Sequence, residues 1–173
     1  MRSSLLVLGF ATVTAACQPT TTRPPFPPLP EAAGQELRLS VREATLRLAQ
    51  ALREDTIPVR RVELRDGYIE SPWFDSRTMR PTRRRPVGTE VVRIRAWADP
   101  ARPGGTRLTV ETLYQPVADP SLPARELERE VPRDHPTARK VEGVLARLAE
   151  RYGAPPPPPQ QPRPEEPTEG DAE

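Results

Sequence analysis

The sequence predicts an α+β fold, in which a four-stranded antiparallel sheet carries an N-terminal and a C-terminal helix on one face. Three observations support this prediction. Two segments repeat apolar residues at helical spacing, and four segments between them alternate apolar with polar residues as strands do. The prolines, 25 among 173 residues, concentrate in residues 18–30 and 154–173, which mark two proline-rich tails around one small domain.

Residues 35–54 are expected to form the first helix. Their apolar residues follow one another at steps of three or four positions, which places them on one helical face: Leu37, Val41, Ala44, Leu48 and Leu52. The other faces carry arginine and glutamate. A single helix of this length is only marginally stable in water, so this amphipathic helix is expected to pack on the sheet.

The first pair of strands is expected at residues 59–64 and 68–71. Residues 65–67, with the sequence Arg-Asp-Gly, have the composition of a tight turn between two strands. Trp73 and Phe74 follow shortly afterwards. Because aromatic residues make up only 5% of the chain, we expect both in the core; the alternative is an exposed aromatic anchor.

The second pair of strands is expected at residues 91–98 and 106–114, where apolar and polar residues alternate most regularly. Alternation of this kind is typical of an antiparallel sheet with one buried face and one face in water. On the water-facing side, Arg93 or Arg95 opposite Glu111 would form a cross-strand ion pair.

Residues 137–152 return to helical spacing and are expected to form the closing helix. The shared apolar face consists of Ala138, Val141, Leu145, Leu148 and Tyr152. Asp134 is a suitable N-cap, and Pro136 fits the first turn. Gly153 and the prolines beyond it are expected to end the helix.

Charge is divided between the domain and the C-terminal tail. Residues 31–153, the expected domain, carry 23 basic and 19 acidic side chains, a net charge of +4. Residues 154–173 carry one arginine and five acids, a net charge of −4, and are rich in proline, so we expect this tail to be disordered. Lys140 is the only lysine. Such an excess of arginine is also what codon usage in a GC-rich genome produces.

The N-terminus has the layout of a secretory signal peptide. Met1 and Arg2 supply positive charge, residues 5–16 are uncharged and mostly apolar, and small residues lead into Cys17. Twelve residues are too few to span a bilayer as a helix. Residues 14–17, Thr-Ala-Ala-Cys, resemble the lipobox of bacterial lipoproteins.

That resemblance implies that residues 1–16 are removed and that Cys17 becomes the lipid-bearing N-terminus, which would anchor the protein to a membrane. Thr14 departs from the usual leucine of the lipobox. Ordinary cleavage after Ala16, giving a secreted soluble protein, is therefore the alternative. Gln18 stands where an aspartate often retains such proteins at the inner membrane. This favours the outer membrane of a two-membrane bacterium, with the protein facing the periplasm.

Residues 17–30 are expected to combine the lipid anchor with a proline-rich tether. A polyproline II chain rises ~3.1 Å per residue, so residues 18–30 could hold the domain roughly 40 Å from the membrane. The same segment matches the loose PxxP pattern of ligands for aromatic grooves. Any proline-dense linker matches that pattern, so a spacer is the expectation.

Residues suited to catalysis are few in this sequence. The chain has one histidine, His135, and no cysteine besides Cys17, so we expect no metal site and no cofactor. It has no glycine-rich phosphate loop. The densest acidic run contains Glu126, Glu128 and Glu130, alternates with arginine, and is expected to be a solvated face. We therefore expect a protein that is not an enzyme.

The strongest polar feature is an arginine-rich segment, residues 77–85, which contains no acidic residue. Its five arginines are Arg77, Arg80, Arg83, Arg84 and Arg85. Guanidinium groups pair with phosphate and carboxylate, so an exported protein could use them to bind an anionic polymer, a lipid headgroup or an acidic protein surface. A nucleic-acid partner is not expected. The alternative is a solvated loop that reflects codon usage and is balanced by the acidic tail.

The central region carries a second resemblance, which rests on element order and on Gly67, Ile69 and Trp73. In these respects residues 35–152 are similar to the helix-grip-like domains of the lipoprotein C subunit of the outer-membrane barrel-assembly machinery. That family has two such domains, whereas this chain would have one. The resemblance implies a non-enzymatic accessory module that binds other proteins. The alternative function is binding of an anionic envelope polymer or lipid headgroup through residues 77–85.

Overall fold

The structure is a computed structural model that describes residues 21–101 and 104–153. The predicted signal peptide, Cys17 and the acidic tail lie outside these residues. The described chain has seven strands and three helices, in this order: β1 (Ala33–Leu37), α1 (Val41–Glu54), β2 (Arg61–Glu63), β3 (Tyr68–Glu70), β4 (Phe74–Asp75), β5 (Gly88–Pro100), β6 (Thr106–Gln115), α2 (Ala124–Leu127), β7 (Arg129–Glu130) and α3 (Pro136–Tyr152). The α+β class is confirmed, but the expectation of four strands is an undercount.

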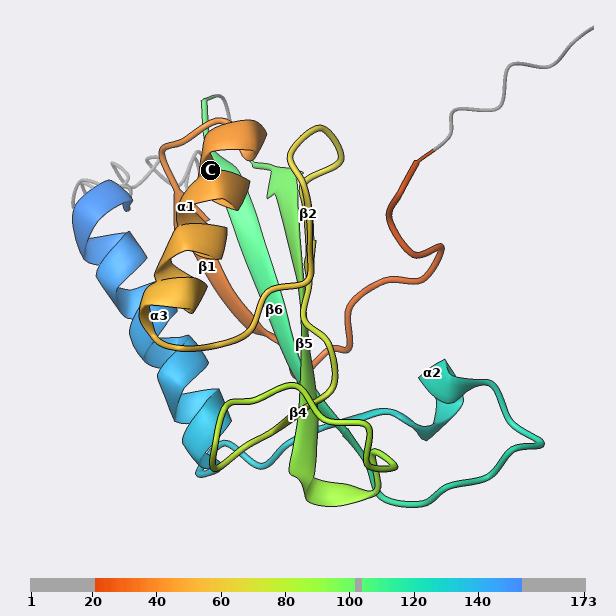
Figure 1. Ribbon diagram of the computed structural model, residues 1–173. Coiled ribbons are helices and arrows are strands. Elements are labelled where there is room, and N and C mark those ends of the chain that lie inside the picture. The colour runs from red at the N-terminus through yellow and green to blue at the C-terminus, as the bar shows by residue number, and fades with distance from the viewer. Residues whose placement is uncertain (1–20, 102–103, 154–173) are drawn as a thin grey trace, which may run out of the picture.

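The long strands β5 and β6 form the centre of the sheet (Figure 1). The strand order is β1-β6-β5-β3-β2, with antiparallel pairing throughout this path. Two short strands join its margins, β4 beside β5 and β7 beside β6. Both predicted hairpins are confirmed, because β2 pairs with β3 and β5 pairs with β6.

The strands missing from the sequence-based prediction are β1, β4 and β7. β4 and β7 have two residues each, too few for alternation to be visible. β1 lies in a segment expected to be helical, so the prediction for residues 35–40 is wrong. Ser40 explains this boundary, since its Oγ accepts a hydrogen bond from the Glu43 backbone N–H at 3.3 Å and caps α1. Leu37 keeps the helical apolar spacing but pairs with Thr106 in the sheet.

α1 and α3 lie together on one face of the sheet, as predicted (Figure 1). The core between helices and sheet contains the predicted apolar faces of both helices and of β5 and β6. Its buried side chains include Ala44, Leu48, Leu52, Val92, Ile94, Ala96, Leu108, Val110, Val141, Leu145 and Leu148. Removing this apolar surface from water is the main stabilising contribution to the fold.

The closing helix α3 ends where the sequence predicts but is capped differently at its start. His135, not Asp134, is the N-cap, and its Nδ1 accepts from the Thr137 backbone N–H at 3.2 Å. At the other end, the Gly153 N–H donates to the Ala149 carbonyl at 2.7 Å. Within the described ranges, no helix combines the length and the apolar character that crossing a membrane requires.

Candidate functional site

The middle of the sheet face opposite the helices is a buried ionic layer, so the prediction of a face in water is wrong there. At the β1 edge of the same face, Arg107 and Glu36 form an exposed cross-strand ion pair, as expected of a face in water. Arg95 and Glu111 lie opposite each other, as predicted, but each forms its ion pair elsewhere. Arg95 forms a bidentate pair with Glu128, with Nη2 2.9 Å from Oε1. Arg125 forms a bidentate pair with Glu111, with Nη2 2.7 Å from Oε1. Glu111 and Glu128 have no exposed surface, because the segment that carries Arg125 and Glu128 folds over the sheet.

Residues 21–30, called here the N-terminal strap, also cover this face. The ring of Phe26 lies below the Arg125 guanidinium, with its centroid 4.5 Å from Cζ, a cation–π arrangement. The Leu29 backbone N–H donates to Oε1 of Glu111 at 2.6 Å. Both the side chains and the backbone of the strap therefore help to cover the buried carboxylates.

The start of the strap is held by two further contacts. Thr22 donates through its backbone N–H to Asp66 at 2.7 Å, and its hydroxyl donates to the same carboxylate. The hydroxyl contact is the main cause that lowers the pKa of Asp66. Arg23 pairs with Asp99 at 2.8 Å. A free spacer was expected over residues 18–30; the described part instead lies on the domain, because its polar and aromatic groups find partners there.

The two aromatic residues expected in the core lie on different faces of the sheet. Phe74 is fully buried in the core, as predicted. Trp73 is half-buried and lies on the ionic face, with its ring centroid 4.7 Å from the Arg93 guanidinium carbon. Burial, followed by the nearby charge of Arg95, lowers the pKa of Arg93. The stack covers part of this guanidinium and so contributes to the ionic layer.

The acidic run from Glu126 to Glu130 is not the solvated face that was expected. Of its three glutamates, only Glu126 is exposed. Glu128 is fully buried against Arg95, and Glu130 is half-buried beside a cavity. Glutamates of a run that also contains arginine are therefore buried in this protein, because each buried carboxylate can accept hydrogen bonds from arginine or backbone donors.

The arginine-rich segment, residues 77–85, begins in an ordered turn after β4. The Asp75 carboxylate accepts from the backbone N–H groups of Arg77 at 3.0 Å and Thr78 at 2.9 Å. The Thr78 hydrogen bond is the main cause that lowers the pKa of Asp75. The Asp75 N–H in turn donates to the Arg80 carbonyl at 3.0 Å, which closes the turn. The structure thus brings the five predicted arginines together on one short exposed stretch.

Two of these five arginines have acidic partners. Arg77 lies 3.3 Å from Glu90, and Arg84 lies 3.7 Å from Glu90 and 3.8 Å from Asp75. These side chains are mostly exposed, and ion pairs of this kind contribute about 0–1 kcal/mol. Within the described part of the chain, three arginines of the segment form no ion pair: Arg80, Arg83 and Arg85. Their charge is available to an external anion.

A groove of about 360 Å³, called here the apolar groove, borders the end of the arginine-rich segment. It is lined by Arg85, Pro86, Gln115, Ala118, Asp119, Pro120, Leu122, Ala124 and Leu127. Leu122 is 44% exposed, and Val117 and Val87, which flank the lining residues in sequence, are 55% and 42% exposed. Figure 1 shows the segment before β5 and the loop before α2 at the same end of the sheet. Clustered exposed apolar side chains mark interaction surfaces more often than scattered ones do.

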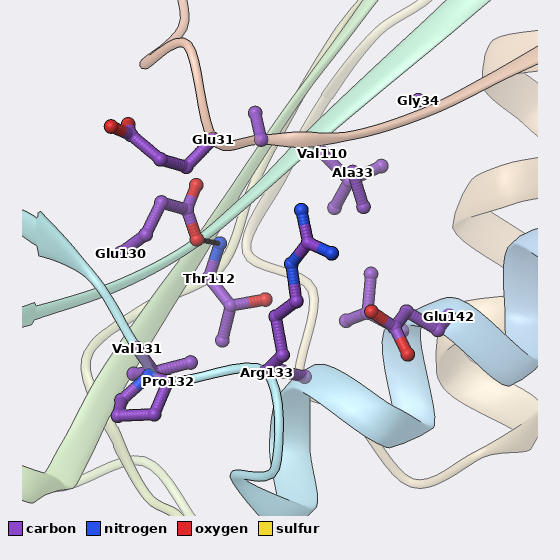
Figure 2. Close-up of a pocket in the computed structure, with 13 residues that line it drawn as sticks. Glu31, Ala33, Gly34, Val110, Thr112, Glu130, Val131, Pro132, Arg133 and Glu142 are labelled. Carbon is purple, nitrogen blue, oxygen red and sulfur yellow. Dashed lines mark hydrogen bonds between the residues drawn. The ribbon is translucent and has the colours of Figure 1, made fainter.

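A second cavity, of about 440 Å³, lies where β6 changes its partner strand. β1 pairs with residues 106–110, and β7 pairs with residues 113–114. Between these ranges, the Thr112 backbone is satisfied in another way. Its N–H donates to Oε2 of Glu130 at 3.0 Å, and its carbonyl accepts from the Val131 N–H at 2.9 Å (Figure 2). A carboxyl group is therefore held beside the cavity because it takes the place of a strand partner.

Glu130 is the most strongly perturbed carboxyl group of this region. Burial raises its pKa to about 8, and the nearby Glu111 and Glu31 add to that shift. Its Oε1 is buried and has no hydrogen-bond partner within the described residues. Figure 2 shows the Arg133 side chain extending into the cavity, with Glu142 of α3 on the neighbouring wall. The cavity therefore combines a carboxyl group of raised pKa, a guanidinium and further acidic side chains.

His135, the only histidine of the sequence, lies at the start of α3. His135 is half-buried, with Nε2 3.1 Å from the Thr89 carbonyl oxygen, and burial lowers its pKa. Over residues 21–101 and 104–153, no group of three or more His, Cys, Asp or Glu side chains could hold a metal ion.

Sequence reasoning found the arginine-rich segment but not the apolar groove or the cavity beside Glu130. The groove lies largely in residues 115–127, which have no helical or strand periodicity. Val117 and Leu122, apolar residues in a proline-rich loop, were the available signal. Cys17, the predicted lipidation site, lies outside the described residues.

The chain was also compared with known proteins. No protein-family model matches it, and a search of curated proteins finds no match.

Proposed function

We propose that this protein is a lipid-anchored component of the cell envelope that binds another protein without catalysing a reaction, and that the apolar groove is its docking surface. The N-terminal signal and Cys17 support the anchor. One observation supports the groove above all others. Three of the four large apolar side chains that are exposed in the described chain, Val87, Val117 and Leu122, lie in the two segments that border it.

The positive charge beside the groove favours a partner with acidic residues. Arg85 lines the groove, and Arg80 and Arg83 precede it in the same segment without an acidic partner in the described chain. A segment that combines apolar with acidic residues would fill the groove and pair with these guanidinium groups. Because the arginines are exposed, added salt should weaken binding but not abolish it, since burial of the apolar residues is less sensitive to screening.

Defined peptides test this proposal directly. We expect the full-length protein in detergent to bind a peptide with two leucines among glutamates more tightly than peptides in which lysine replaces the glutamates or serine replaces the leucines. Leu122→Asp should weaken binding of the acidic peptide at least tenfold. Leu46→Asp, at an exposed apolar position on α1, is the matched control and should leave binding unchanged. Equal binding of all three peptides, or equal effects of the two substitutions, would contradict the proposed docking surface.

The unpaired arginines favour a second candidate function, the binding of an anionic envelope polymer or lipid headgroup. In that case, the protein should bind vesicles that contain an anionic lipid at least as tightly as it binds the acidic peptide. Replacing Arg77, Arg80, Arg83, Arg84 and Arg85 with glutamine should abolish this binding, whereas Leu122→Asp should not affect it. The two variants therefore distinguish a lipid or polymer surface from a protein partner.

The proposed anchor has its own test. Mass spectrometry of the N-terminal peptide from membrane-extracted protein should show a lipid-modified Cys17 as the first residue. Inhibiting lipoprotein signal peptidase should leave residues 1–16 attached. An unmodified Cys17 in soluble protein would exclude the anchor and would leave the groove to a secreted binding protein.

A further inference from the structure

We propose that the cavity between β1, β6, β7 and α3 binds a small zwitterion with an apolar body, namely an α-amino acid of about the size of leucine. Its carboxylate would pair with Arg133, and its ammonium group would lie against Glu130. This site is independent of the proposed docking function, since the cavity and the apolar groove share no lining residue.

The cavity has the dimensions and the floor of a small-molecule site. Its volume of about 440 Å³ lies within the range of about 300–1,000 Å³ that is common for such sites. The apolar part of its lining includes Ala33, Val110, Val131, Ala138 and Val141. Ala33, Val110, Ala138 and Val141 belong to β1, β6 and α3, and Val131 directly follows β7. The floor is therefore held mainly by the sheet and by α3. A branched aliphatic side chain would be removed from water on this floor.

Glu130 provides the group that recognises a cation. One carboxyl oxygen accepts from the Thr112 N–H, and the other is buried without a hydrogen-bond partner in the described chain. A ligand ammonium group can donate to this carboxyl group, and a buried acceptor that gains a donor loses its desolvation penalty. Glu31, which lies near Glu130, and Glu142, on the α3 side of the cavity, are exposed and add negative charge to its lining (Figure 2).

Arg133 provides the group that recognises an anion. Its side chain is exposed and forms no ion pair with any residue that the structure describes. Figure 2 shows its guanidinium raised from the loop after β7 into the space between β1 and α3. A guanidinium fork binds a carboxylate through two parallel hydrogen bonds, which fixes the orientation of the ligand as well as its charge. Arg133 and the carboxyl groups line the same cavity as the apolar side chains. An amino acid has the matching groups: a carboxylate, an ammonium group and an apolar side chain.

Ligands that lack one group at a time test the assignment. We expect calorimetry on the full-length protein in detergent to detect binding of L-leucine. Binding should be at least tenfold weaker for 4-methylpentanoate, which lacks the ammonium group, and for 3-methylbutylamine, which lacks the carboxylate. Arg133→Gln should weaken leucine binding at least tenfold. Arg139→Gln, at an exposed position of α3 outside the lining, should not. No binding of leucine, or equal binding of all three ligands, would overturn the proposal.

The proton on Glu130 offers a second readout. An ammonium group stabilises the ionised carboxylate, so leucine binding near neutral pH should release a proton. Calorimetry in two buffers of different ionisation enthalpy measures this release. The release should disappear in Glu130→Gln, provided that circular dichroism shows the fold unchanged. Leucine binding without proton release from the unmodified protein would contradict the role of Glu130. The result of the leucine experiments does not depend on whether the acidic peptide binds the apolar groove, so the two proposals can fail separately.

Discussion

At the scale of single residues, the ionic layer depends on carboxylates that are removed from water completely. Glu128 and Glu111 are each paired with an arginine fork, and both have no exposed surface. Moving a carboxylate out of water is costly, and only complete pairing with hydrogen bonds offsets that cost. Removing one partner therefore leaves an uncompensated charge, which is more damaging than the loss of a surface pair.

We expect Glu128→Ala to reduce the free energy of unfolding by about 3–5 kcal/mol, since it leaves Arg95 buried without its bidentate partner. Glu126→Ala is the matched control, two residues away and exposed, and should change stability by about 0.5 kcal/mol or less. Urea denaturation measures both values. Equal effects of the two substitutions would show that the buried pair does not stabilise the fold.

Glu130 should make stability depend on pH. Its pKa is raised from 4.5 to about 8 by burial, with Glu31 and Glu111 adding to the shift and Arg125 opposing it. Between these two values the folded protein holds a proton that the unfolded chain releases. This contribution to stability is complete below about pH 4.5 and is lost as the pH rises through about 8.

The urea midpoint of the unmodified protein should therefore fall between about pH 5.5 and about pH 8.5, and it should fall less in Glu130→Gln. His135, whose lowered pKa changes stability in the opposite direction at acid pH, is present in both proteins, so its effect cancels in the comparison. Identical pH profiles of the two proteins would contradict a buried, protonated Glu130.

At the scale of the elements, the regular parts of the fold could be predicted from the sequence. The alternation in β5 and β6 and the apolar spacing of α3 locate these elements because each extends over ten residues or more. β4 and β7 have no such signal, and Leu37 continues the apolar spacing of a helix while it lies in β1. Ser40 was the available cue for the true start of α1.

The site residues were harder to predict than the elements. Arg80, Arg83 and Arg85 are close in sequence, so their cluster was visible. Glu130 and Arg133 come to lie beside β1 and α3 only when the chain folds. No local sequence pattern distinguishes these two residues from the other charged residues of the chain. The prediction of a water-facing side was wrong for the middle of the sheet, because alternation shows that two faces differ, not that one of them remains uncovered.

Gly67 provides a test of the β2–β3 turn. Its φ is +63°, and a Cβ added there would lie 2.4 Å from the Ala98 carbonyl oxygen and 2.8 Å from Val41 Cγ1. Gly88 has a φ of +80° with no atom within 4 Å of such a Cβ. Both Gly→Ala substitutions incur the cost of the left-handed conformation, but only Gly67→Ala adds a clash. We expect Gly67→Ala to lower the unfolding free energy by about 1–3 kcal/mol more than Gly88→Ala; equal thermal stability of the two variants would contradict the close approach.

At the scale of the whole molecule, the two faces of the sheet are covered in different ways. α1 and α3 bury apolar side chains on one face, whereas the N-terminal strap and the segment around α2 cover charged groups on the other (Figure 1). The strap begins four residues after Cys17, the predicted lipid anchor. Its attachment would therefore hold the domain closer to the membrane than an extended tether of the same length.

Phe26→Ala should loosen the strap without unfolding the domain. The substitution removes the ring that stacks on Arg125 and Arg95, a contribution of about 1–2 kcal/mol. Hydrogen exchange followed by NMR should show faster exchange of the Leu29 amide, whose acceptor is Glu111. Pro25→Ala, at an exposed position of the same strap, is the control. Unchanged exchange at Leu29 in Phe26→Ala would show that the ring does not hold the strap.

The most direct test of the account is site-specific photo-crosslinking in intact cells. A photoreactive phenylalanine analogue at Leu122 should crosslink to one envelope protein, with a yield that falls when Arg80, Arg83 and Arg85 are replaced by glutamine. The same analogue at Leu46, exposed on α1, should give no such product. This result would place a protein partner on the apolar groove. Equal products from both positions, or none from Leu122, would contradict the central claim that this groove is where the protein acts.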